Sequence, residues 1–108
     1  MRNGLIEIDG NKTWYLNDKP HRENGPAIIK ENGTLLWMKN GEFHREDGPA
    51  VEYYFGTKMW MINNKYHRLD GPAIIYDDGS ESWFFNGVEI PCSSQEEFER
   101  LIKLKAFW

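Results

Sequence analysis

The sequence predicts a mainly β fold, an elongated antiparallel meander of tandem hairpin repeats of about 23 residues with one C-terminal capping helix. Two series of residues predict it, because both recur at the same interval. The string His-Arg-x-x-Gly-Pro-Ala begins at His21, His44 and His67, and a tryptophan recurs 23 residues apart at Trp14, Trp37, Trp60 and Trp83. A fixed period of this size is typical of chains built from stacked supersecondary units.

The 108 residues form one domain, which we divide into repeats at about 5–27, 28–50, 51–73 and 74–91, the last one cut short. Each repeat opens with an apolar residue or pair, and a glycine follows five residues later. Asp9-Gly10, Asn32-Gly33 and Asp78-Gly79 are expected to be tight hairpin turns, because Asp-Gly and Asn-Gly tolerate positive φ. Phe55 breaks this pattern in the third repeat.

The strand through each tryptophan ends at a second turn, at Asn17-Asp18, Asn40-Gly41, Asn63-Asn64 and Asn86-Gly87. The Gly-Pro step that follows cannot lie in a central strand, since proline lacks the amide donor. Each unit is therefore expected to contain a strand, a turn, a second strand, a second turn, a short strand and a loop.

A helix is predicted at about residues 94–106. Ser94 with Glu97, or Ser93 with Glu96, fits a capping box, and an apolar stripe begins at Phe98. A stacked array exposes its terminal face, so we expect this helix to cap the last repeat. The alternative is that it docks on a partner.

Composition excludes several classes of protein. The net charge of −4 disfavours nucleic-acid binding, which requires a basic surface. No signal peptide and no membrane span is expected, so a cytoplasmic location is the default. The single cysteine, Cys92, cannot form an internal disulfide.

No residue is assigned to catalysis or to a metal, and no cofactor is expected. Histidines one unit apart should lie about 10 to 14 Å from each other, too far to share an ion. Cys92 has no histidine near it in sequence, and no glycine-rich phosphate loop is present.

The recurring side chains are interpreted as structural, because stacking needs the same group in every unit. This set comprises Trp14, Trp37, Trp60, Trp83, His21, His44, His67, Arg22, Arg45 and Arg68. The alternative is that the tryptophan and arginine rows bind a nucleotide, another small ligand or an acidic partner.

The strand face opposite the tryptophans is also apolar in the middle units. We expect it to form an exposed patch that binds a protein, because exposed apolar patches mark interaction sites. Its candidate residues are Leu36, Met38, Tyr53, Tyr54, Met59, Met61 and Phe84. The alternatives are that this face is internal or that it is closed by self-association into a homo-oligomer.

Residues 5–91 resemble MORN-type repeats, particularly the variants found in bacteriophage and bacterial antitoxin-like proteins. The phrase Trp-x-x-Asn-Gly at Trp37 and Trp83 and the string His-Arg-Glu-Asp-Gly-Pro-Ala at His44 carry this resemblance. It implies a scaffolding or binding role, and specifically a small inhibitor that occludes a host defence or toxin protein. An arginine follows each histidine where the common unit has glycine, so the lipid-facing functions of that family are not expected.

Overall fold

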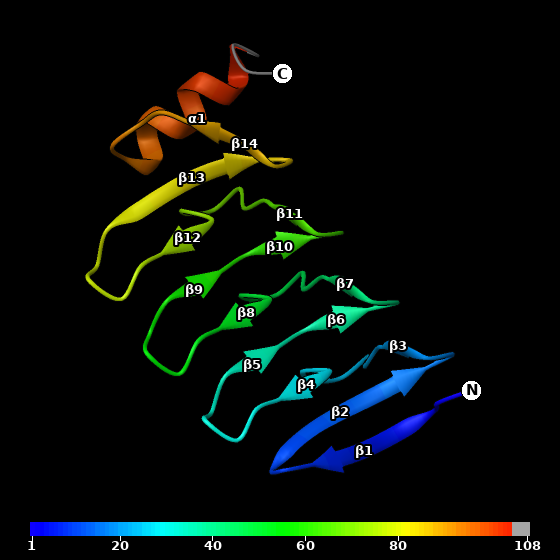
Figure 1. Ribbon diagram of the computed structural model, residues 1–108. Coiled ribbons are helices and arrows are strands. Elements are labelled where there is room, and N and C mark those ends of the chain that lie inside the picture. The colour runs from blue at the N-terminus through cyan, green and yellow to red at the C-terminus, as the bar shows by residue number, and fades with distance from the viewer. Residues whose placement is uncertain (105–108) are drawn as a thin grey trace.

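The computed structural model describes residues 1–104 and confirms the predicted architecture (Figure 1). The molecule measures 46 × 28 × 17 Å between Cα atoms, and its radius of gyration of 15.5 Å exceeds the roughly 13 Å typical of a compact domain of this size. The units therefore follow one another in one direction. Strand β1 lies at one end and helix α1 at the other (Figure 1).

The strands and the helix are distributed over four units. The first contains β1 (Gly4–Ile8), β2 (Asn11–Leu16) and β3 (Lys19–Pro20). The second contains β4 (Ile28–Ile29), β5 (Leu35–Leu36), β6 (Met38–Lys39) and β7 (Glu42–Phe43), and the third contains β8 (Val51–Glu52), β9 (Lys58–Met59), β10 (Met61–Ile62) and β11 (Lys65–Tyr66). The last contains β12 (Ile74–Ile75), β13 (Glu81–Phe85), β14 (Val88–Ile90) and α1 (Gln95–Lys103).

Ten of the strands in residues 1–104 form one antiparallel sheet in the order β1-β2-β4-β5-β8-β9-β12-β13-β14, with β3 paired to β2. The hairpins β6–β7 and β10–β11 each form a separate two-stranded ladder. Thus the second half of each middle unit leaves the main sheet.

In the two middle units the strand is interrupted at the tryptophan, between β5 and β6 and between β9 and β10, and this break separates the small hairpins from the main sheet. The backbone N–H of Trp37 donates to the Ala50 carbonyl at 2.7 Å, and the Trp37 carbonyl accepts from the His44 N–H at 3.1 Å. Both partners belong to the same unit, so the tryptophan does not continue the ladder with the neighbouring strand. The same two bonds recur at Trp14 and Trp60.

The second turns are confirmed, since both central residues have positive φ in all four, for example 51° at Asn40 and 80° at Gly41. The tight first turn is confirmed only at Asp9-Gly10 and is wrong at Asn32-Gly33 and Asp78-Gly79, where only the glycine has positive φ. There the Asn or Asp side chain instead accepts a hydrogen bond from the backbone two residues later, which stabilises a wider loop.

One row of side chains crosses the main sheet on the core side. Cross-strand pairing joins Ile6, Thr13, Ile28, Leu36, Val51, Met59, Ile74 and Ser82 in this row. A core cluster in the middle units contains Ala50, Val51 and Met61, with Leu36, Trp37, Phe43, Tyr53, Met59 and Tyr66 packed against it.

This core corrects the expectation that Met38 and Met61 lie on an exposed binding face. Both side chains are buried, at 8% exposure each. The expectation assigned the tryptophans and the methionines to opposite faces, whereas Trp37 and Met59 both pack against the cluster that contains Met61. Tryptophans and methionines therefore share one core.

Helix α1 confirms the predicted cap. Ser94 is its N-cap, because its side chain accepts from the Glu97 N–H at 3.1 Å, while Glu97 Oε1 accepts from the Ser93 N–H at 3.0 Å. Phe98 packs against Trp83 and Ile90 in the second core cluster. The helix ends at Lys103, earlier than expected, and positions 105 and 106 of the prediction lie outside the described residues.

Candidate functional site

The arginine of each full unit is held between a tryptophan and a glycine of that unit. Arg68 Cζ lies 3.8 Å from the Trp60 ring centroid, and Arg68 Nη1 donates to the Pro72 carbonyl at 3.1 Å. A Cβ atom on Gly71 would lie 2.6 Å from Arg68 Cζ, so a side chain there would displace the guanidinium. The equivalent sets are Arg22 with Trp14 and Gly25, and Arg45 with Trp37 and Gly48.

A loop carboxylate completes this arrangement in two of the units. Arg45 Nε donates to Asp47 Oδ1 at 3.0 Å and Arg68 Nε to Asp70 Oδ1 at 2.9 Å. The hydrogen bond from Arg68 is the main cause that lowers the pKa of Asp70 below its ordinary value. Arg45 Nη1 also lies 3.5 Å from Glu52 Oε2 of the third unit, so this guanidinium contacts both its own loop and the next unit.

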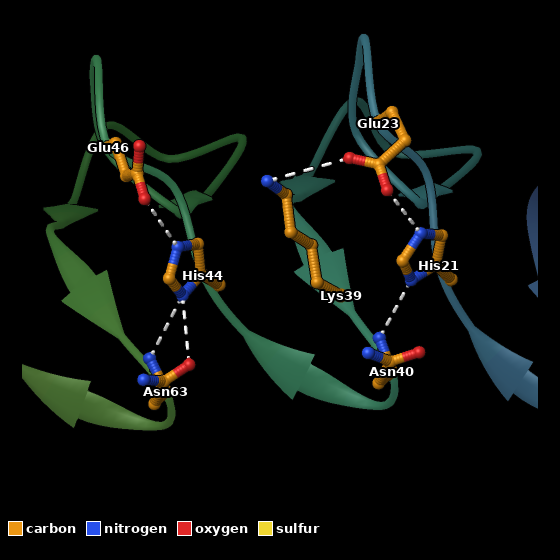
Figure 2. Close-up of polar contacts among 7 residues, drawn as sticks. All are labelled: His21, Glu23, Lys39, Asn40, His44, Glu46 and Asn63. Atoms are coloured by element: carbon orange, nitrogen blue, oxygen red, sulfur yellow. Dashed lines mark hydrogen bonds and ion pairs between the residues drawn. The ribbon is translucent and has the colours of Figure 1, made fainter.

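Each histidine contacts the turn of the next unit. Nδ1 of His21 accepts from the Asn40 N–H at 2.9 Å, and its Nε2 lies 2.9 Å from Glu23 Oε1 (Figure 2). Lys39 lies 3.6 Å from the other oxygen of Glu23 (Figure 2). The His21 hydrogen bond, followed by the charge of Lys39, lowers the pKa of Glu23.

The contact repeats along the chain with one change. Nδ1 of His44 lies 3.3 Å from the Asn63 backbone nitrogen and 3.1 Å from Asn63 Oδ1, and Nε2 lies 3.3 Å from Glu46 (Figure 2). Nδ1 of His67 accepts from the Asn86 N–H at 3.0 Å. In the third unit, however, leucine occupies the position of Glu23 and Glu46, so His67 lacks the equivalent carboxylate.

Acidification is expected to weaken the His67 contact. Burial lowers the pKa of His67 below its ordinary value of 6.5, so the folded protein favours neutral imidazole more than the unfolded chain does. This contribution to stability is therefore complete above pH 6.5 and is lost as the pH falls from 6.5 through the folded pKa. NMR titration of the His67 ring should give a midpoint below 6.5, and a midpoint at or above that value would contradict the expectation.

Cys92 does not have the environment of a nucleophile. Burial, with a smaller contribution from Glu97, raises the pKa of its thiol. The thiol is therefore protonated at neutral pH, whereas catalytic cysteines need a lowered pKa.

The seven residues of the predicted patch do not form one exposed surface. Met38 and Met61 are buried, and Leu36, Tyr53 and Met59 are half-buried against the same core cluster. Phe84 is half-buried, with its ring 5.0 Å from that of Tyr66. Tyr54 is exposed, at 65%.

Tyr54 belongs to a cluster of three rings, which we name the aromatic turn and define as Tyr53, Tyr54 and Phe55. The rings of Tyr53 and Phe55 stack with centroids 4.9 Å apart, and Tyr54 meets Phe55 edge-on at 5.3 Å. Phe55 is 49% exposed. The cluster lies in the loop between β8 and β9, in line with the β4–β5 and β12–β13 loops along one side of the molecule (Figure 1).

Phe55 occupies a position that has a structural role in the neighbouring units. Asn32 Oδ1 accepts from the Thr34 N–H at 2.9 Å, and Asp78 Oδ1 accepts from the Ser80 N–H at 2.9 Å. Phenylalanine has no acceptor, so the third unit gives up this hydrogen bond and exposes an aromatic ring instead. Sequence reasoning omitted Phe55 from the candidate residues, although its departure from the Asp/Asn pattern was the signal that could have identified it.

An acidic residue of the following loop borders the aromatic turn. The Cβ of Tyr54 approaches Gly33 of the preceding loop, and Gly56 lies beside Asp77 of the following loop. Hydrogen bonds from Ser80, first from its hydroxyl and then from its amide, lower the pKa of Asp78. The turn is thus an apolar surface with negative charges on the adjacent loop.

A groove of about 720 Å³ lies between the His-Arg loops of the second and third units. Trp60 and Arg68 line it together with the carboxylates of Glu46, Asp47 and Asp70. Arg45 also lines the groove, and Asp47 and Asp70 pair with Arg45 and Arg68, so the lining offers no excess of positive charge to an anionic ligand such as a nucleotide.

Comparison of the chain with protein-family models, with curated proteins and with solved structures finds no match. Among residues 1–104, no three His, Cys, Asp or Glu side chains are grouped so that they could hold a metal ion. No helix in that range has both the length and the apolar character needed to cross a membrane.

Proposed function

We propose that this chain is a cytoplasmic, non-catalytic repeat protein of MORN-like type that binds another protein, with the aromatic turn at the centre of the contact. The observation that carries this proposal is the exposure of Tyr54 and Phe55 at a position where the second and fourth units have a turn-capping Asn or Asp. Aromatic side chains dominate the energetics of protein interfaces, and exposed apolar clusters mark them.

We infer the partner's chemistry from the surroundings of the aromatic turn. Asp77 of the following loop lies beside Gly56, the residue after Phe55, and Asp78 adds a second negative charge to that loop. A complementary partner offers an apolar pocket for the rings with lysine or arginine at its rim. The resemblance to bacteriophage and antitoxin-like repeats supports an inhibitory role, in which the bound chain occludes a host defence or toxin protein.

Two alternatives differ in their support. A nucleotide or small-ligand site on the tryptophan and arginine rows is disfavoured, because each guanidinium already stacks on a tryptophan and bonds within its own loop. A self-associating scaffold remains the second candidate, and the outer edge of β1 favours it.

The test replaces two residues of the aromatic turn with the residues found at the equivalent positions of the second unit. The double variant Tyr54→Glu with Phe55→Asn copies Glu31 and Asn32, and should lower capture of the partner from a host lysate at least tenfold by quantitative mass spectrometry. It should melt at or above the wild-type temperature, because asparagine can again accept from the Thr57 N–H, and such a bond contributes about 0.5–1.5 kcal/mol.

Leu69→Glu is the matched control. Leu69 is also exposed and also departs from the other units, which have Glu23 and Glu46 at that position, but it lies in the His-Arg loop. This variant should capture the partner as the wild type does. Equal capture by a folded Tyr54→Glu/Phe55→Asn variant would remove the aromatic turn from the interface.

A further inference from the structure

The two ends of the main sheet differ in what packs against them. Helix α1 packs on the last hairpin through Phe98, whereas β1 is the first strand of the sheet and pairs only with β2 among residues 1–104. The Trp14 backbone bonds to Ala27 and His21, on the side away from β1. Trp14 and Leu5, which face each other, therefore form a non-hydrogen-bonded pair, and Leu5 directs its N–H and carbonyl to the outer edge. The backbone N–H and carbonyl of Glu7, two residues later, also point to the outer edge.

Strand β1 also differs from the first strands of the later units. It pairs over five residues through the tight Asp9-Gly10 turn, whereas β4, β8 and β12 are two residues long. The tight turn sets Leu5 opposite Trp14, while the equivalent residue of the second unit, Ile28, lies opposite Leu36. This shift of one residue places Leu5 on the face away from the core row.

The edge lacks the features that protect exposed strands from pairing. Between Gly4 and Ile8 it has no proline and no lysine, and its single charge, Glu7, faces Lys12 of β2 at 3.8 Å. Leu5 and Ile8 are 47% and 64% exposed. An edge of this kind is a template for another strand.

We propose that β1 pairs antiparallel with β1 of a second copy of this chain, so that two sheets join about a twofold axis perpendicular to them. Such an axis keeps each face of the sheet continuous, so opposed residues must lie on the same face. Centring the pair on Ile6 sets the two Ile6 side chains against each other and extends the apolar core row. Leu5 and Glu7 of the second copy then exchange backbone hydrogen bonds.

The same register also leaves room for the residues at the two ends of β1. It sets Ile8 opposite Gly4 of the second copy, and no atom lies within 4 Å of the position that a Gly4 Cβ would occupy. Centring on Glu7 would oppose two carboxylates, and centring on Leu5 would set Ile8 against Arg2. Self-complementarity in one register favours a second copy over an unrelated strand as the occupant.

Proline at position 7 is the sharpest test, because the Glu7 N–H points away from β2. Glu7→Pro removes a donor that only the second copy uses, and proline is tolerated on edge strands. Light scattering after gel filtration should give the mass of two chains for the wild type and for the control Glu7→Ala, and one chain for Glu7→Pro. Circular dichroism should show that Glu7→Pro keeps the wild-type fold.

Two results would overturn the proposal: a wild-type chain that stays monomeric up to millimolar concentration, or a folded Glu7→Pro variant that stays dimeric. If Glu7→Pro does not fold, Ile8→Lys tests the same edge, since this exposed side chain can be charged without disturbing the monomer. It should weaken dimerisation at least tenfold, and an unchanged dimer would again refute the pairing. The aromatic-turn variant should remain dimeric, so this outcome is independent of partner binding.

Discussion

Replacing Met61 with aspartate is expected to unfold the protein. The side chain is 8% exposed and packs with Ala50 and Val51, so the carboxylate would be buried without a partner. The cost of burying a charge in this way is several kcal/mol, which is comparable with the whole stability of a small domain, about 5–15 kcal/mol. Circular dichroism should show loss of the cooperative thermal transition.

Met61→Leu is the control, because it conserves volume and is expected to cost less than about 1.5 kcal/mol. Its melting curve should remain close to that of the wild type. A cooperative transition near the wild-type temperature for Met61→Asp would mean that the side chain reaches solvent, and the exposed apolar face expected from strand alternation would then be restored.

Truncating Phe98 to alanine is expected to have the second-largest effect. Phe98 has no exposed surface and joins α1 to Trp83 and Ile90, and removing a buried phenylalanine ring costs about 3–5 kcal/mol. Because α1 has only nine residues, it depends on this packing rather than on its own helical propensity. Loss of the ring should therefore release the helix and uncover Trp83.

Urea denaturation measures the loss of stability, and amide hydrogen exchange locates it. Exchange should accelerate most in α1 and β14, while the middle units change less. Glu96→Ala on the exposed side of the same helix is the control and should alter stability by less than about 1 kcal/mol. Uniform exchange in Phe98→Ala would show that the helix is not a separable cap.

The period, the second turns and the capping helix could be predicted because their causes are local. Asn40-Gly41 adopts positive φ through its own residue types, and Ser94 with Glu97 fixes the start of α1. The break in the strand at Trp37 could not be predicted, because a strand pattern does not reveal the backbone hydrogen bonds of Trp37 to Ala50 and His44.

The same distinction between local features and contacts between distant residues applies to the candidate site. The recurrence of the histidines and arginines predicts a structural role, which stays a prediction. Their contacts could not be predicted, because Asn40 and His21 meet only when units stack. Tyr54 was identified as a candidate within a set whose other members are buried or half-buried. In the sequence, Phe55 differs from the other units only by replacing the Asp or Asn that precedes the glycine of the first turn.

The contacts between units join each one to its immediate neighbour, from His21 to Asn40, from His44 to Asn63 and from His67 to Asn86. Because each of these contacts joins only neighbouring units, none of them depends on the total number of units in the chain. A duplication or deletion of one whole 23-residue block would lengthen or shorten the molecule by one step and leave both ends unaltered. Recombination between the repeats of its gene would change the length of this protein by whole units, whereas an insertion or deletion that is not a multiple of 23 residues would put the histidines and their asparagines out of phase.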